Sequence, residues 1–215
     1  AGRTSTGVRG IRLADGDEVV SLSILTHVDA TPEERAAFFK MKRDEGLEIV
    51  REAAPEADEV PTDSVTLSQE RYEELKQKEQ YILTVSDRGY GKRSSSYEYR
   101  TAGRGGQGIW NMEMGERNGS IVAAFPVESN HQVMMVTNGG QVIRMPLHDV
   151  RVAGRKTLGV TLFRVGADER VVSVATIAEE EGENGVDTGV ETGDAANGSV
   201  EPTGDAGSSA APNES

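Results

Sequence analysis

The fold is decided by a stretch of sequence that occurs twice, LTVSDRGYGKR at residues 83–93 and MMVTNGGQVIR at residues 134–144. Each copy is an apolar run, then a polar turn containing glycine, then a second run that closes on arginine. The copies are 51 residues apart. Because turns of this composition tolerate positive φ angles, each copy predicts a β-hairpin.

The same spacing continues beyond the hairpins. The dipeptide Gly-Arg stands at 103–104 and again at 154–155, and a glycine follows five residues after the first glycine of each pair. A third copy opens the chain, with Gly-Arg at 2–3 and a glycine at residue 7. The Gly-Arg pairs at 2–3 and 103–104 are 101 residues apart, about 50 more than the repeat spacing of 51. One repeat therefore contains an insertion of about 50 residues, which residues 26–80 supply.

Within a repeat, short runs rich in Val, Ile, Thr and Met lie between turn clusters. Four short strands per 51 residues are typical of a propeller blade, so we predict an all-β repeat fold of β-pinwheel or propeller-like blades. The predicted organisation is the end of one blade at 1–25, an acidic helical insertion at 26–80, a complete blade at 81–130, the last blade at 131–177 and a disordered acidic tail at 178–215.

The insertion has helix signals in place of strand signals. Thr31-Pro32-Glu33-Glu34 is a capping box with proline at the first helical position, and it predicts a short helix through the alanine and phenylalanine residues that follow. A second helix is expected to begin after Ser68 and to run through Lys76. We interpret the insertion as a helical decoration of a blade loop.

The net charge of −13 is distributed unevenly. The stretch 178–215 has ten acidic residues and no Lys or Arg, a composition that cannot bury enough apolar surface to fold. The insertion has 15 acidic and 8 basic residues, whereas 1–25 and 81–177 together have 11 acidic and 15 basic residues, most of them Arg. The acidic protein therefore contains a mildly basic body.

Several kinds of site are disfavoured by composition. The chain has no Cys, so disulfides, thiolate metal sites and a Cys nucleophile are excluded. Its longest apolar runs have four or five residues, where a membrane helix needs about 20. The three histidines, at 27, 131 and 148, lack ligand spacing. The start at Ala1-Gly2-Arg3, without Met or a signal peptide, indicates a cytoplasmic fragment of a longer protein.

Four stretches together resemble the C-terminal domain found in the A subunit of DNA gyrase. They are GRTSTGVRGIRLADGDEVVSL (2–22), YILTVSDRGYGKRSSSYEYR (81–100), VMMVTNGGQVIR (133–144) and VAGRKTLGV (152–160). In that family the domain is a six-bladed β-pinwheel whose positively charged rim wraps DNA. The hallmark Gln-Arg-Arg-Gly-Gly-Arg/Lys-Gly box of the family is absent here, and residues 103–108 are at best a degenerate counterpart.

The resemblance implies a role within DNA gyrase, an ATP-dependent type II DNA topoisomerase that introduces negative supercoils. The implied partners are duplex DNA, the gyrase B subunit and the rest of the gyrase A subunit. The two kinds of subunit would form an A2B2 complex, and no membrane partner is implied. ATP and Mg²⁺ belong to the parent complex, and no cofactor and no catalytic residue are expected within this chain. The implied location is the bacterial cytoplasm, associated with the nucleoid.

A physical argument independent of the resemblance points to the same ligand. Glycine lets a DNA backbone approach closely, and arginine offers a forked donor to phosphate oxygens, so a repeated Gly-Arg element predicts a curved cationic strip with little sequence readout. The predicted phosphate contacts are Arg3, Arg93, Arg104, Arg144, Arg155 and Lys156, followed by Lys92, Arg9, Arg100 and Arg151. For Arg93 and Arg144 the alternative is a structural arginine that pairs with a neighbouring blade.

Two other functions stay open at this point. The homologous subunit of topoisomerase IV has a related, shorter pinwheel without the box. Repeats near 50 residues also occur in propellers that bind other proteins, and duplex-DNA affinity that falls with salt and depends on the Gly-Arg positions would distinguish the two classes. For the acidic tail two roles stay open, competition with DNA for the cationic strip and an inert contribution to solubility.

Overall fold

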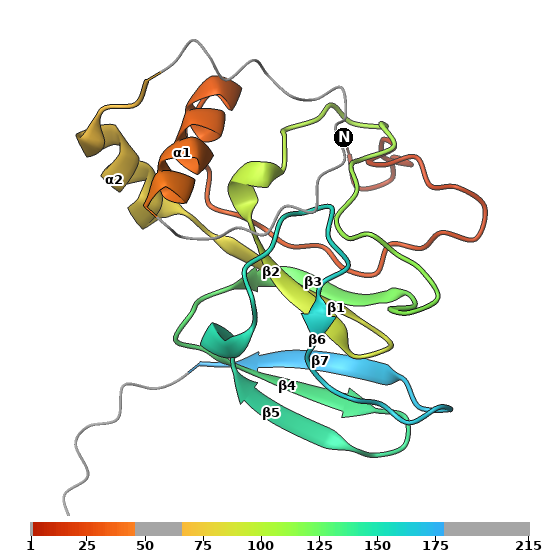
Figure 1. The fold of residues 1–215 in the computed structure, drawn as a ribbon. Helices are drawn as coiled ribbons and strands as arrows, with labels where there is room; N and C mark the ends of the chain where they lie inside the picture. Colours follow the sequence, from red (N-terminus) through yellow and green to blue (C-terminus); the bar gives the residue numbers. More distant parts are fainter. Residues whose placement is uncertain (1, 46–65, 179–215) are drawn as a thin grey trace, which may run out of the picture. The chain divides into compact units, whose positions relative to one another are not determined.

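The structure is a computed structural model that describes residues 2–45 and 66–178 (Figure 1). The chain divides into two units, Ala1–Glu180 and Glu181–Ser215, and the described residues all belong to the first. The predicted disordered tail lies outside the described residues except for Ala178. The helices are α1 (Pro32–Asp44), α2 (Gln69–Lys78) and the short 3-10 helices η1 (Ser96–Glu98) and η2 (Leu147–Asp149). The strands are β1 (Tyr81–Ser86), β2 (Tyr90–Ser95), β3 (Ile121–Val127), β4 (Gln132–Thr137), β5 (Val142–Pro146), β6 (Val160–Thr161) and β7 (Val171–Ile177).

The described strands form two antiparallel sheets that repeat one pattern, with strand orders β3-β1-β2-β6 and β5-β4-β7. The two predicted hairpins have the same register, since Leu83 lies opposite Arg93 and Met134 lies opposite Arg144. In each sheet a later strand, β3 or β7, pairs with the first strand of the hairpin. The predicted all-β repeat fold with a helical insertion is confirmed.

The first sheet contains one strand that comes from the second repeat. Strand β6 pairs with β2, so that Thr161 lies opposite Tyr90 and Val160 lies opposite Gly91. The sheet therefore crosses the boundary between 81–130 and 131–177, because β2 has an open edge that the following repeat covers.

A glycine makes this crossing possible. Gly159, directly before β6, has φ of +79°, and a Cβ built there would lie 2.8 Å from the carbonyl oxygen of Gly91. Gly7 and Gly108, its counterparts in the sequence repeats, have φ of 76° and 80°. The same left-handed conformation at all three positions supports the assignment of residues 1–25 to the repeat pattern.

One apolar core joins the two sheets. Both hairpins contribute to it, as do β3, η2 and β7, and burying each such aliphatic side chain stabilises the fold by about 1.5–3 kcal/mol. Its buried members are Leu83, Val85, Val127, Val133, Met135, Leu147, Val150 and Val171. Because the two repeats share this core, they fold as one body.

The insertion forms the two predicted helices with a second core. Thr31 and Glu34 form the predicted capping box at the start of α1, and Ser68 caps α2. The apolar cluster contains Val28, Ala37, Phe38, Phe39, Leu67, Tyr72, Leu75 and Tyr97. At the base of the insertion, the side-chain amide of Gln80 accepts the N–H of Thr26 and donates to its carbonyl, both at 2.9 Å. The two ends of the insertion are therefore held together.

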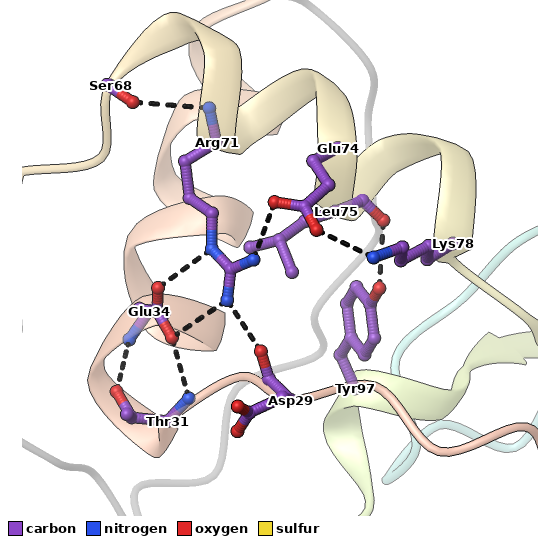
Figure 2. Close-up of polar contacts among 9 residues, drawn as sticks. All are labelled: Asp29, Thr31, Glu34, Ser68, Arg71, Glu74, Leu75, Lys78 and Tyr97. Atoms are coloured by element: carbon purple, nitrogen blue, oxygen red, sulfur yellow. Dashed lines mark hydrogen bonds and ion pairs between the residues drawn. The ribbon is translucent and has the colours of Figure 1, made fainter.

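Arg71 holds the two helices against each other, as Figure 2 shows. From α2, its guanidinium donates to the Glu34 carboxylate of α1 at 2.9 Å, to Glu74 at 2.7 Å and to the carbonyl of Asp29 at 2.5 Å. The bond from Arg71 is the main reason that the pKa of Glu34 is lowered.

Within the described residues, no helix is both long and apolar enough to cross a membrane.

The capping box gives a first prediction about stability. Thr31 Oγ1 accepts the N–H of Glu34 at 3.2 Å, and the Glu34 carboxylate accepts the N–H of Thr31 at 2.8 Å. We expect Thr31→Ala to lower the free energy of unfolding by about 1 kcal/mol, measured by urea denaturation. Thr66→Ala, at an exposed position outside the helices, is the control. Equal losses in both variants would refute a specific capping effect.

Candidate nucleic-acid interface

Lys92 does not lie on the surface. Its side chain is fully buried, and its ammonium donates to the carbonyls of Gly154 at 2.8 Å, Arg155 at 2.5 Å and Thr157 at 3.0 Å. Burial lowers the pKa of Lys92 to about 8. This position contradicts the predicted phosphate contact of Lys92, because three backbone carbonyls of the next repeat already surround the ammonium.

Arg93 is also a structural residue. It is 7% exposed, and its guanidinium donates to the carbonyl of Val150 at 2.8 Å and to Ser129 Oγ at 3.1 Å. Burial lowers its pKa below the ordinary value. Arg93 thus has the structural role named as its alternative, which is pairing with the neighbouring repeat. Its burial contradicts the predicted phosphate contact.

The other predicted residues reach the surface. Arg144 donates to Gln132 Oε1 at 2.5 Å and stays exposed, while Arg155 and Lys156 are partly exposed. The remaining exposed members of the predicted set are Arg3, Arg9, Arg100, Arg104 and Arg151. These eight cations can approach a polyanion without unfolding any part of the body.

The Gly-Arg loop at 103–106 lies beside residues 10–12, which belong to another repeat. The N–H of Gly105 donates to the carbonyl of Gly10, and the N–H of Arg12 donates to the carbonyl of Gly106, both at 2.8 Å. These bonds bring the loop that carries Arg104 against the segment that carries Arg9. Backbone bonds thus join two segments of different repeats, each of which carries an exposed arginine.

The third Gly-Arg loop is held by its backbone. Glu98 Oε2 accepts the N–H of Arg155 at 2.7 Å, and the Lys92 ammonium binds the carbonyls on the same loop. The Arg155 guanidinium donates to the carbonyl of Trp110. The arginine therefore projects from a loop whose main chain is fixed on both sides.

Two further arginines were missed by the sequence analysis. Exposed Arg117 donates to the Tyr90 hydroxyl at 3.1 Å, and its guanidinium lies 5.2 Å from the centre of the ring. The hydrogen bonds with Arg117 and then Thr161 lower the pKa of Tyr90, and the charge of Arg164 makes a smaller contribution. Neither arginine stands at a Gly-Arg position, so the repeat pattern contained no signal for them. Arg117 and the predicted Arg151 line one shallow groove.

These features define a class of protein: a propeller-type repeat domain whose successive repeats carry exposed arginines. Within the parts of the chain that the structure describes, no group of three His, Asp or Glu residues is placed to hold a metal ion. In the described part of the chain, the exposed cations of the predicted set are dispersed over the repeats, and Arg117 and Arg151 line a groove. Such a surface is suited to an extended anionic ligand.

The comparisons with known proteins give the family. Residues 1–26, 80–128 and 131–178 match the family described as "DNA gyrase C-terminal domain, beta-propeller". The chain belongs to this family.

Individual relatives agree with the family. The chain is 52% identical over 190 residues to the DNA gyrase A subunit of Granulibacter bethesdensis, covering 84% of this chain and 20% of that protein. The same subunit of Rickettsia bellii is 43% identical over 186 residues, covering 86% of this chain and 20% of that protein. A solved structure of the DNA gyrase A C-terminal domain has 26% identity and a TM-score of 0.43, covering 45% of this chain and 33% of that chain. The chain spans about a fifth of the length of these curated relatives.

Proposed function

We propose that this chain binds duplex DNA through the backbone phosphates and contributes to wrapping the duplex. The observation that carries the proposal is the exposure of arginines at equivalent repeat positions, Arg104 and Arg155, in a chain of the gyrase C-terminal family. Arginine presents a planar fork of donors that matches phosphate oxygens. We expect equivalent cations on successive repeats to follow the curved path that a bent duplex requires.

The described helices do not favour sequence readout. Helix α1 carries Glu33 and Glu34 in its first turn, and α2 carries Glu70, so each presents acidic groups where it would enter a groove. Contacts to phosphates place a protein on DNA without reading bases. We therefore expect affinity that depends weakly on sequence and strongly on salt.

The proposed parent enzyme is an ATP-dependent type II topoisomerase that introduces negative supercoils. The names of the relatives support this context, since each is a gyrase A subunit. In this proposal the chain is part of an A2B2 complex that contains the gyrase B subunit and the rest of the gyrase A subunit. The complex would act in the bacterial cytoplasm, associated with the nucleoid. ATP, Mg²⁺ and strand cleavage would act on other parts of the complex, and the acidic tail would compete with DNA for the arginines.

A salt titration tests the DNA-binding proposal. Fluorescence anisotropy would measure the binding of the whole chain to duplexes of about 30 base pairs with unrelated sequences. We expect similar affinities for all of them, and a logarithm of the association constant that falls linearly with the logarithm of salt, by about 0.9 per phosphate contacted. Affinity for one sequence alone would contradict backbone recognition. No duplex binding at low salt would favour the protein-binding propeller.

A further inference from the structure

The short helix η1 connects the helical insertion to the rest of the body. Its Tyr97 is buried in the apolar cluster of the insertion, with its ring 5.4 Å from that of Phe38 and edge-on to it. The Tyr97 hydroxyl donates to the carbonyl of Leu75 at 2.8 Å, as Figure 2 shows. Just after η1, the carbonyl of Tyr99 accepts a bond from Arg35 at 3.4 Å. Both insertion helices therefore hold this turn.

The residue between these two tyrosines faces the DNA-binding candidates. Glu98 accepts the backbone N–H of Arg155 at 2.7 Å. The ammonium of Lys92 binds the carbonyls of Gly154 and Arg155, and the charge of Glu98 favours the protonated form of Lys92. Packing of the insertion is thus connected through one turn to the backbone of the loop that presents Arg155.

The second repeat provides an internal comparison. Helix η2 follows η1 by 51 residues, so His148 corresponds to Tyr97 and Asp149 corresponds to Glu98. In that repeat a short connection between β3 and β4 replaces the insertion. The side chains of His148 and Asp149 are 69% and 59% exposed, whereas Tyr97 is 6% exposed. The buried tyrosine therefore accompanies the helices that cover it.

We propose that the helical insertion positions the DNA-binding loop 154–156, and that Tyr97 and Glu98 are the positioning residues through which it acts on Arg155. This inference rests on the proposed function, because it assigns a control element to the same cationic surface. A loop held in its binding conformation loses less conformational entropy when it contacts a phosphate. Neither positioning residue needs to touch DNA.

Glu98 gives a test in which the sign of the effect is informative. Removing a carboxylate near a polyanion should by itself strengthen binding, so Glu98→Gln, which keeps an oxygen to accept the Arg155 N–H, is expected to bind DNA at least as tightly as the wild-type chain. Glu98→Ala removes the acceptor and is expected to bind more weakly, by up to about eightfold at 0.1 M salt, the value of one phosphate contact. Asp149→Ala is the matched control, which loses a carboxylate at the equivalent position and is expected to behave like Glu98→Gln.

A double-mutant cycle with Arg155→Ala separates positioning from general stability. We expect Glu98→Ala, and to a smaller extent Tyr97→Phe, to weaken DNA binding in the wild-type chain and to have no further effect when Arg155 is already alanine. The inference would be overturned if Glu98→Ala weakened DNA binding by the same factor when Arg155 is already alanine. Equal DNA affinities of the Glu98→Ala and Glu98→Gln chains would also overturn it. Failure of the wild-type chain to bind any duplex would overturn the proposed function itself. Thermal unfolding of each variant confirms that the compared proteins are folded.

Discussion

Replacing Arg104 and Arg155 together by alanine is expected to weaken duplex-DNA binding roughly 60-fold at 0.1 M salt. The value follows from two lost phosphate contacts, each contributing about 0.9 to the slope of the logarithm of the association constant against the logarithm of salt. The slope itself should become shallower by about two units, and the loss should be similar for unrelated sequences. Both side chains reach the surface from equivalent Gly-Arg loops. Anisotropy titrations from low to moderate salt measure both quantities.

The matched control removes the same charge elsewhere. Lys40 and Arg43 are exposed on α1, away from the Gly-Arg positions in the sequence repeats. The double variant Lys40→Ala/Arg43→Ala changes the net charge by the same amount and should keep nearly all of the affinity and of the salt slope. If both double variants lose affinity equally, net charge decides binding and the Gly-Arg positions have no special role.

Replacing Lys92 by alanine is expected to have a different effect, a loss of stability. Of the three carbonyls that accept from its ammonium, that of Gly154 keeps the N–H of Thr157 at 3.1 Å and that of Thr157 keeps the N–H of Glu113 at 3.3 Å, whereas that of Arg155 loses the ammonium donor. An acceptor left without its donor costs about 1–3 kcal/mol, so the free energy of unfolding should fall by about 1–3 kcal/mol. Urea denaturation followed by circular dichroism measures this loss.

Lys156 is the comparison for Lys92 because it lies on the same loop and is partly exposed. Lys156→Ala should change the free energy of unfolding by about 0.5 kcal/mol or less and should act on DNA binding instead. A Lys92→Ala chain with wild-type stability and a shallower salt slope would show that Lys92 contacts phosphate after all. It would also contradict the buried position of its ammonium.

The hairpins and the helix starts could be predicted from sequence because their signals are local. Turn glycines, such as Gly89 and Gly140 with φ of 76° and 82°, act within a few residues, and so does the capping box at Thr31. The pairing of β6 with β2 joins residues about 70 positions apart. No local pattern at Val160 names its partner strand, so the crossing between repeats could not be predicted.

The candidate site was predicted in part for the same reason. Cations at the repeated Gly-Arg positions, Arg104 and Arg155, do reach the surface. Only the structure places Arg117 in the same groove as Arg151, because its position beside Tyr90 comes from tertiary packing. The role inferred for Tyr97 and Glu98 likewise depends on contacts with residues distant in the sequence.

Arg93 and Arg144 show most clearly where the sequence stops being sufficient. The repeat pattern alone determined that both close a hairpin, and both are paired in equivalent registers. The tertiary structure decided their chemistry: Arg93 is buried against the loop of the next repeat, whereas Arg144 is exposed. Strand β2 is covered by β6 and the residues before it, and in the described part of the chain no strand covers the outer edge of β5. Local sequence sets the conformation of each arginine, while burial depends on which distant segment packs against it.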